Sequence, residues 1–383
     1  MKILYVTTSG GTMNFFKSFL HELISKGDSV DIATNETISL VPECYREWGC
    51  KVYPISCTRS VFCSGNLKAI KELKKLVTRN RYDLVHCHTP IAAACTRVAC
   101  QEWRKKGGKV IYTAHGFHFF RGAPLKNWLL YYPVEKFLSH WTDCLITINR
   151  EDYKRAKRKL HTKQTEYVPG VGIDLEKFHI PEFVKNSDGI LIPYPVWREG
   201  KRNELGLGKD DIVIISVGEL NSNKNHKTMV KVVAELKNER VKYLICGQGR
   251  LRDGLGKLVK KLGLEKQVFL LGFRDDIREL LWAGDLFAFP SRREGLPVAL
   301  MEAMASGMPC IAGDIRGNQD LFSNGKEGYL LPVDRVKVWK EKIQCCIRNL
   351  EEERNIAKKD ITGMEIFSAS KIEDRMKKIY HML

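Results

Sequence analysis

Short apolar runs of strand length alternate with longer, helix-like segments along almost the whole of this 383-residue chain. Such alternation is typical of βαβ units, in which helices cross over between the strands of a parallel sheet. The order of the segments predicts an α/β protein with two successive arrays, each of which builds its own sheet. Strands of the first array are expected at residues 3–7, 29–33, 51–55, 84–86, 110–113 and 144–147, and strands of the second at residues 213–217, 243–246, 268–270, 286–289 and 309–312.

The chain is longer than one hydrophobic core normally serves, which indicates at least two domains. Residues 186–208 carry prolines and several glycines with little periodicity, so we expect them to connect the two arrays. The expected division is a first domain over residues 1–185, a linker region over 186–208, a second domain over 209–365 and a terminal segment over 366–383.

Cysteine usage and the N-terminal segment predict a cytoplasmic protein. The 12 cysteines are scattered and form no paired Cys-x-x-Cys units, so reduced thiols are expected rather than a disulfide or zinc framework. Residues 1–8 lack the basic region, the long apolar core and the cleavage site of a signal peptide. No run approaches the ~20 apolar residues that a membrane-spanning helix needs.

The formal net charge is +18, and most of the excess lies in the first 185 residues. Basic runs at 68–81 and 154–159 fall on predicted helices, where they are most often solvated faces; the functional alternative is an anionic surface. Segment 117–132 interleaves aromatic and basic residues in the manner of an interfacial segment, and no nucleic-acid module appears, so we favour a membrane surface. An equally simple interpretation places Trp128, Leu129 and Tyr132 in the core.

A short predicted helix begins close to Pro297, directly after the strand expected at 286–289. Proline suits the first helical position, and Leu296 before it cannot cap the free N–H groups as Ser, Thr, Asp or Asn would. The amides of Val298 and Ala299 are therefore expected to be open to a phosphate, with help from the positive end of the helix dipole.

Two carboxylates flank this helix start. Glu294 lies in the loop before the helix and Glu302 about two turns further on, so both are expected to accept hydrogen bonds from hydroxyl-rich groups on either side of a bound phosphate. An ordinary helix with two surface glutamates is the plain alternative.

The block at residues 283–309, with its Glu-x7-Glu motif, resembles glycosyltransferase family 4, the retaining, nucleotide-sugar-dependent transferases of the GT-B fold. Segments 113–118, 168–174 and 217–226 are most similar to enzymes of bacterial capsule and exopolysaccharide assembly. The resemblance covers residues 3–383. It implies two Rossmann-like parallel-sheet domains facing a central cleft, with the acceptor bound by the first domain, the nucleotide sugar by the second, and a terminal helix that crosses back to the first.

The resemblance assigns catalytic roles to His115, Lys224 and Glu294. His115 matches the family's cleft histidine beside the donor sugar, and Lys224 would neutralise charge on the departing diphosphate. The family often has arginine where this chain has Glu219, which puts the usual pair of cations in doubt. Arg250 and Arg293 are candidates to replace it.

The remaining donor contacts follow from the same resemblance and from the open helix start. Glu302 would hold the ribose hydroxyls, Glu294 the hydroxyls of the transferred sugar, and the backbone near Phe273 and Arg274 the uracil edge. Glycines at strand ends would let the backbone approach the nucleotide, although each is also a common turn residue. The full donor-binding set is Gly10, Gly11, Glu219, Lys224, Gly247, Gly249, Phe273, Arg274, Glu294, Gly295, Leu296, Pro297, Val298, Ala299 and Glu302.

No metal or cofactor is expected besides the UDP-sugar donor. The chain contains no Asp-x-Asp triplet, which argues against a metal-bridged diphosphate. His86 and His88 are two apart on a predicted strand and so share a face, and His118 is close in sequence to His115. No carboxylate or third ligand is positioned to complete a site.

These features predict a retaining, metal-independent hexosyltransferase. It would move a hexose or N-acetylhexosamine from a UDP-sugar to a polyprenyl-diphosphate-linked saccharide, as a cytoplasmic protein peripheral on the inner membrane face, in capsule or exopolysaccharide synthesis. The alternatives are a nucleotide-sugar epimerase of the same fold and a nonenzymatic polyanion-binding protein. Sugar identity and linkage depend on loop side chains that the sequence alone does not specify.

Overall fold

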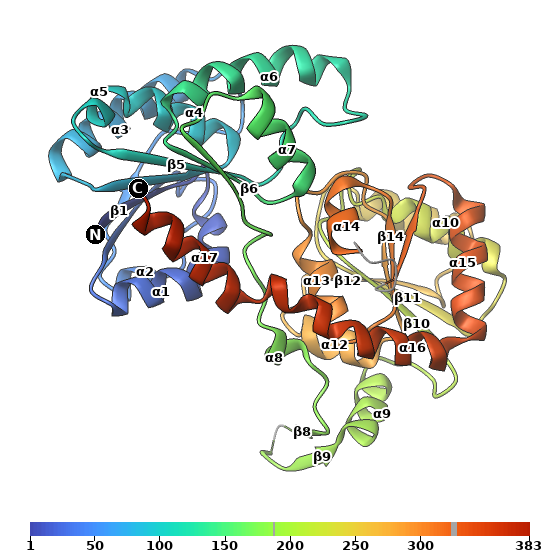
Figure 1. Cartoon of the computed structure of the whole chain (residues 1–383). Coiled ribbons are helices and arrows are strands. Elements are labelled where there is room, and N and C mark those ends of the chain that lie inside the picture. The colour runs from blue at the N-terminus through green and yellow to red at the C-terminus, as the bar shows by residue number, and fades with distance from the viewer. Residues whose placement is uncertain (187, 323–327) are drawn as a thin grey trace. The chain divides into compact units, whose positions relative to one another are not determined.

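The computed structural model describes residues 1–186, 188–322 and 328–383, and the chain in it forms two compact units (Figure 1). The first unit comprises Met1–Val171 with Ile372–Leu383, and the second comprises Gly172–Lys371. The boundaries differ from the expected ones, because residues 172–185 group with the second unit. Residue 187 of the expected linker and residues 323–327 of the expected second domain lie outside the described residues.

The sheet of the first unit is parallel and has the strand order β3-β2-β1-β4-β5-β6-β7. All strands predicted for this array are confirmed, and β7 at the edge was not predicted. The strands are β1 (Lys2–Val6), β2 (Ser29–Thr34), β3 (Val52–Pro54), β4 (Leu84–His88), β5 (Lys109–Ala114), β6 (Cys144–Thr147) and β7 (Gln164–Tyr167).

Helices cover both faces of this sheet, because successive strand residues point to opposite faces and the residues on both faces are apolar. Leu4 and Val6 of β1 belong to one buried cluster, and Ile3 and Tyr5 belong to another. The second cluster includes the C-terminal helix, which Figure 1 shows in red beside α1 in blue. The helices are α1 (Lys17–Ser25), α2 (Cys44–Glu47), α3 (Ser64–Asn80), α4 (Pro90–Ala99), α5 (Gln101–Lys105), α6 (Leu125–Leu138), α7 (Arg150–Lys159) and α17 (Ala369–His381).

The sheet of the second unit has the order β12-β11-β10-β13-β14-β15 and is also parallel. The five predicted strands are confirmed, and the short edge strand β15 was not predicted. They are β10 (Ile212–Val217), β11 (Val241–Cys246), β12 (Val268–Gly272), β13 (Leu286–Phe289), β14 (Cys310–Gly313) and β15 (Tyr329–Leu331).

Around this sheet α10 and α15 pack side by side on one buried cluster (Figure 1). The helices of the second unit are α8 (Leu175–Phe178), α9 (Tyr194–Glu204), α10 (His226–Leu236), α11 (Arg252–Lys261), α12 (Ile277–Ala283), α13 (Val298–Ala305), α14 (Arg316–Leu321), α15 (Val336–Arg348) and α16 (Leu350–Lys359). No helix in the described parts of the chain is long and apolar enough to cross a bilayer.

The expected linker is more regular than its sequence indicated. An antiparallel hairpin, β8 (Phe183–Lys185) with β9 (Leu191–Pro193), leads directly into α9. Pro195 falls in the first turn of that helix, where the missing N–H of proline leaves no hydrogen bond unmade, so the prolines start the helix rather than prevent it.

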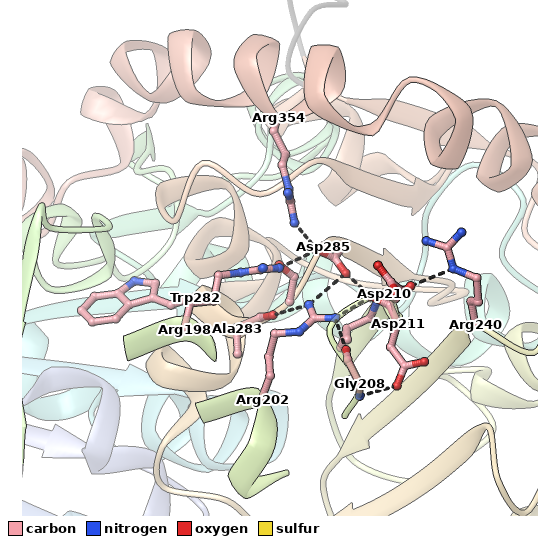
Figure 2. Close-up of polar contacts among 12 residues, drawn as sticks. Arg198, Arg202, Gly208, Asp210, Asp211, Arg240, Trp282, Ala283, Asp285 and Arg354 are labelled. Atoms are coloured by element: carbon pink, nitrogen blue, oxygen red, sulfur yellow. Dashed lines mark hydrogen bonds and ion pairs between the residues drawn. The ribbon is translucent and has the colours of Figure 1, made fainter. Parts of the chain in front are cut away.

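Asp285 fastens two of these helices to the sheet (Figure 2). Its Oδ1 accepts from Arg198 of α9 at 2.6 Å and from Arg354 of α16. Its Oδ2 accepts from Arg202 of α9 at 3.3 Å and from the backbone amide of Val213 at 2.7 Å. One buried carboxylate at the start of β13 therefore ties α9, α16 and β10 together.

Both sheets reverse their strand order beside the first strand of their own array. The reversal falls between β1 and β4 in the first sheet and between β10 and β13 in the second. In open parallel sheets, ligands bind outside the carboxyl ends of the strands at such a switch point. The loops that follow these four strands are therefore the places to look for a site.

Candidate functional site

The loops that follow β10 and β13 are joined at the switch point of the second sheet. The side-chain amide of Asn223 donates to the carbonyl oxygen of Arg293 at 2.8 Å, and the amide of Arg292 donates to the carbonyl oxygen of Asn223 at 2.8 Å. Across the same junction Lys224 Nζ lies 2.8 Å from Glu294 Oε1. The structure brings the predicted leaving-group lysine and the predicted sugar-binding glutamate into direct contact.

The position of Lys224 is set by its neighbours rather than left to a free surface loop. Asn221 Oδ1 accepts from the backbone amides of Asn223 and Lys224, each at 3.0 Å. The ammonium lies 4.7 Å from the centre of the Phe289 ring, a cation–π distance. The aliphatic stem passes Gly218, where an added Cβ would come within 3.0 Å of Lys224 Cε. The cation is held at the switch point while one fifth of its side chain stays exposed.

The start of α13 lacks a side-chain cap, as the sequence predicts, although the expected position of Pro297 was wrong by one residue. Pro297 is the N-cap, with φ −82° and ψ 116°, and the helix begins at Val298. The extended ψ of the proline places it outside the helix, and it has no side-chain acceptor to offer. The first turn, with the amides of Val298 and Ala299, is therefore not capped by a side chain.

Glu302 lies in the second turn of α13 and is half-buried. Burial raises the pKa of its carboxyl to about 7, and the positive charge of Lys177 on α8 offsets part of that rise. None of the residues that the structure describes donates a hydrogen bond to this carboxylate. Glu302 is therefore a half-buried carboxylate that is free of protein donors among the described residues and can accept hydrogen bonds from a ligand.

Two of the predicted glycines are required by close packing of the loops after β10 and β11. A Cβ on Gly247 would lie 2.0 Å from the carbonyl oxygen of Gly218, and a Cβ on Gly249 would lie 2.6 Å from that of Leu220. The amide of Leu220 also donates to the carbonyl oxygen of Gln248 at 2.8 Å. These contacts explain the glycines by packing between loops, and their contact with a nucleotide stays a prediction.

The remaining predicted residues of the second unit are less closely bound to the centre of the site. Phe273 is 74% exposed at the end of β12. The guanidinium of Arg274 donates to the carboxylate two residues further on at 2.6 Å, which raises the pKa of Arg274. Glu219, Arg250 and Arg293 are exposed.

Gly295 and Leu296 form the turn between Glu294 and Pro297. Leu296 is buried, and the Gly295 carbonyl oxygen packs so closely on Gly317 of α14 that a Cβ there would lie 2.4 Å away. The turn before α13 is therefore supported from α14.

Gly10 and Gly11 belong to the first unit, and their amides already have partners. The Gly10 amide donates to the carbonyl oxygen of Ser39 at 3.1 Å, and the Gly11 amide donates to the Ser39 hydroxyl at 2.8 Å. A Cβ on Gly10 would lie 2.5 Å from the Val41 amide nitrogen. Packing against residues 39–41 accounts for Gly10, and a diphosphate contact stays a prediction.

His115, also in the first unit, follows β5 and contacts His88 at the end of β4. His88 Nδ1 lies 3.1 Å from His115 Nε2. His86, two residues before His88, lies 2.7 Å from Thr113 Oγ1 and 2.6 Å from the Tyr380 hydroxyl. Burial lowers the pKa of His115 to about 4 and that of His86 to about 3, so both rings are neutral near pH 7. Within the described parts of the chain no three His, Cys, Asp or Glu side chains form a group that could hold a metal ion.

Sequence analysis missed Thr89, which connects β4 to α4. Its φ of 64° is unusual for a residue other than glycine, and its hydroxyl lies 2.7 Å from that of Thr8 after β1. Strained residues of this kind gather at functional sites. The position of Thr89 before Pro90 predicts an extended ψ, which Thr89 has at 139°, but it also predicts a negative φ, so the sequence carried no signal for the strained φ.

Two parallel sheets with Rossmann-like strand order, and a lysine–glutamate pair beside an uncapped helix at the switch point of the second sheet, are the arrangement expected of a glycosyltransferase of GT-B fold. Models of two families match the chain, “Glycosyl transferase 4-like” over residues 2–149 and “Glycosyl transferases group 1” over residues 198–361. Together the two models cover both parts of the chain, and the chain therefore belongs to the family 4 type of glycosyltransferases. This confirms the resemblance found in the sequence.

The relatives agree with this assignment over most of their length. The chain is 36% identical to EpsD of Bacillus subtilis (strain 168), assigned as a glycosyltransferase, over 86% of this chain and 84% of EpsD. It is 29% identical to the UDP-Gal:alpha-D-GlcNAc-diphosphoundecaprenol alpha-1,3-galactosyltransferase of Escherichia coli, over 84% and 81% of the two chains. Neither the epimerase nor the polyanion-binding alternative is favoured by these relatives.

Among solved structures, HepE of Anabaena in complex with UDP superimposes on the whole chain with a TM-score of 0.81 at 20% identity, and all of both chains is covered. At this identity the likeness concerns the fold, which is confirmed as GT-B.

Proposed function

We propose that this glycosyltransferase moves a hexose or N-acetylhexosamine from a UDP-sugar to a polyprenyl-diphosphate-linked saccharide, with retention of anomeric configuration and without a metal ion. The observation that carries the proposal is the Lys224–Glu294 contact beside the uncapped start of α13. The relatives support the substrate classes, since one is named for transfer from UDP-galactose to a diphosphoundecaprenol-linked sugar and HepE was solved with UDP.

Lys224 changes partner in this proposal. In the free protein its ammonium is neutralised by Glu294, and a diphosphate brings a stronger anion to the same place. As the bond between the anomeric carbon and the diphosphate oxygen breaks, charge develops on that oxygen, and Lys224 with the amides of Val298 and Ala299 stabilises it. Glu294, released from the lysine, accepts hydrogen bonds from the sugar hydroxyls.

The acceptor hydroxyl attacks from the face that the diphosphate leaves. Its oxygen forms the new bond to the anomeric carbon, and its proton passes to a phosphate oxygen of the departing UDP. No protein base is required for this step, which suits the low pKa of His115, because a ring with a pKa of about 4 is a weak base. His115 borders the sugar as a neutral hydrogen-bonding group.

Glu302 holds the ribose hydroxyls in this proposal, and the first unit binds the acceptor. Because the lipid of such an acceptor lies in a membrane, the protein works as a peripheral protein on the cytoplasmic face.

Thermal-shift screening against a panel of UDP- and GDP-sugars identifies the donor, and transfer to a synthetic polyprenyl-diphosphate-linked sugar is then followed by UDP release. We expect a UDP-sugar to stabilise the protein, the product to keep the donor's anomeric configuration by NMR, and the rate to be unchanged by a chelator. Stabilisation by GDP-sugars alone, an inverted product, or loss of activity with chelator that metal restores would each refute the corresponding part.

A further inference from the structure

The exposed face of helix α6 in the first unit is mostly apolar. Leu125 is 73% exposed, Leu129 71% and Phe137 61%, and Leu130 and Val134 are exposed with them. These side chains project from one half of the helix surface. Large apolar side chains gathered on one exposed face mark an interaction site more often than isolated ones do.

The opposite face of α6 already supplies the contacts that the fold needs. Trp128, Tyr131 and Tyr132 pack against a buried core cluster of the first unit, and Leu138 is buried. Of the residues that sequence analysis could assign to either core or membrane, Trp128 and Tyr132 therefore belong to the core, whereas Leu129 does not. Packing of α6 leaves its outer face unexplained.

The two faces of α6 carry charges of opposite sign: the buried face carries the negative charge and the exposed face the positive charges. The only acid of the helix, Glu135, is buried and accepts from both terminal nitrogens of Arg97, at 2.5 and 3.0 Å. The exposed face carries Lys126 and Lys136, and exposed Arg121 precedes the helix. Every charge that α6 shows to its surroundings is positive.

Helix α7 adjoins α6 and adds to this positive charge. The guanidinium of Arg155 lies 5.0 Å from the centre of the Trp128 ring. On the same helix, Lys154, Lys157 and Arg158 are exposed.

We propose that the exposed face of α6 docks on an anionic membrane surface, with the helix lying in the plane of the interface. Leu125, Leu129, Val134 and Phe137 enter the boundary between headgroups and acyl chains, while Lys126 stays at headgroup level. This rests on the proposed function, because a polyprenyl-linked acceptor is held in a membrane. A second copy of the chain fits the face poorly, since a two-fold contact would bring the lysines of both copies into one apolar interface in which α6 offers no exposed acid to pair with them.

The test uses the full-length protein and vesicles of equal parts phosphatidylglycerol and phosphatidylcholine, with pure phosphatidylcholine as reference. We expect cosedimentation with the anionic vesicles. The double variant Leu129→Gln/Phe137→Gln should bind at least about tenfold more weakly. Lys126→Gln/Lys136→Gln should bind about twenty-five-fold more weakly, because each lysine near an anionic surface contributes about fivefold.

A matched control lies in the second unit, where Phe183 and Leu191 are an exposed aromatic and an exposed leucine on the β8–β9 hairpin. Phe183→Gln/Leu191→Gln should bind vesicles as the wild type does, and circular dichroism should show that all three double variants stay folded.

The proposal is overturned if Leu129→Gln/Phe137→Gln binds vesicles with wild-type affinity. It is equally overturned if the hairpin control loses as much vesicle affinity as this α6 variant does. It is also overturned if the α6 variant turns a dimer into a monomer in sedimentation, because the face is then a contact between subunits. Vesicle binding needs no nucleotide sugar, so its outcome is independent of the donor screen. A protein that binds vesicles but no UDP-sugar would disprove the proposed function and would still support membrane docking through α6.

Discussion

Donor binding should depend on pH through Glu302. Burial raises the pKa of this carboxyl from 4.5 to about 7, so it is part neutral and part ionised near neutral pH. Ribose hydroxyls donate hydrogen bonds, and an ionised carboxylate accepts them better than a protonated one does. A bound UDP-sugar should therefore favour the ionised form, lower the pKa of Glu302 and release a proton.

The magnitude follows from the ionised fraction. With a pKa near 7, about a tenth of the free protein is ionised at pH 6 and about nine tenths at pH 8, so affinity should be about tenfold weaker at pH 6. His115 and His226, whose pKa values burial lowers to about 4, do not titrate in this window. The diphosphate of a UDP-sugar, unlike that of UDP, has no terminal phosphate to titrate there.

Whereas donor affinity should rise with pH, the folding stability of the protein without donor should fall as pH rises. A folded-state pKa raised above the unfolded value means that the neutral form is favoured on folding, so this contribution is full below about pH 4.5 and lost as pH rises through about 7. The shift corresponds to at most about 3 kcal/mol. Glu302→Gln, a neutral side chain of the same shape, should therefore unfold at a higher temperature than the wild type at pH 8, and the difference should shrink towards pH 5.

Isothermal titration with the UDP-sugar at pH 6, 7 and 8, in two buffers of different ionisation enthalpy, measures both affinity and proton release. Glu302→Gln should bind weakly with no pH dependence across this range. A flat wild-type profile, or the same slope in the glutamine variant, would refute the assignment of the titration to Glu302.

Other perturbations test the rest of the site and fold. Lys224→Ala should lower kcat by about a hundredfold or more, because it removes the cation at the leaving group, and Glu294→Gln should lower it less; near-normal turnover of the lysine variant would contradict this. Gly247→Ala should lower the free energy of unfolding by about 1–3 kcal/mol, because its Cβ would lie 2.0 Å from a carbonyl oxygen, whereas Gly254→Ala, at an open helical position of α11, should raise it by up to about 1 kcal/mol; denaturant titration compares the two, and equal effects would contradict the packing argument. Asp285→Asn should destabilise the fold by about 3–5 kcal/mol, because three arginines lose a buried carboxylate; an unchanged melting temperature would show that this cluster is dispensable.

The sequence predicted the architecture well because strands buried on both faces leave continuous apolar runs. It missed β7, whose residues Gln164–Tyr167 are all only half-buried, and β15, which has three residues. Such edge strands bury less apolar surface and leave a weaker pattern. It also took the prolines of α9 as a sign of an irregular connection.

The loops of the site were predictable from strand ends, but their contacts were not. Lys224 and Glu294 are 70 residues apart, and only the pairing of β10 with β13 brings their loops together. The contact of His88 with His115 depends in the same way on the register of β4 against β5. Neither contact leaves a local signal in the sequence.

Among the residues that the structure describes, the buried carboxylates have donors, whereas the half-buried Glu302 has none. Glu135 is paired with Arg97, and Asp143 accepts from Arg104 at 2.7 Å, whereas no described residue donates to Glu302. Partial burial disfavours the ionised form of Glu302, as its raised pKa of about 7 shows, and a ligand that donates hydrogen bonds would favour that form. Helix α13 thus begins with amides that no side chain caps and carries, in its second turn, a carboxylate to which no described residue donates. An anion joined to a diol would satisfy both ends, and a nucleoside diphosphate has that arrangement in its phosphate and ribose.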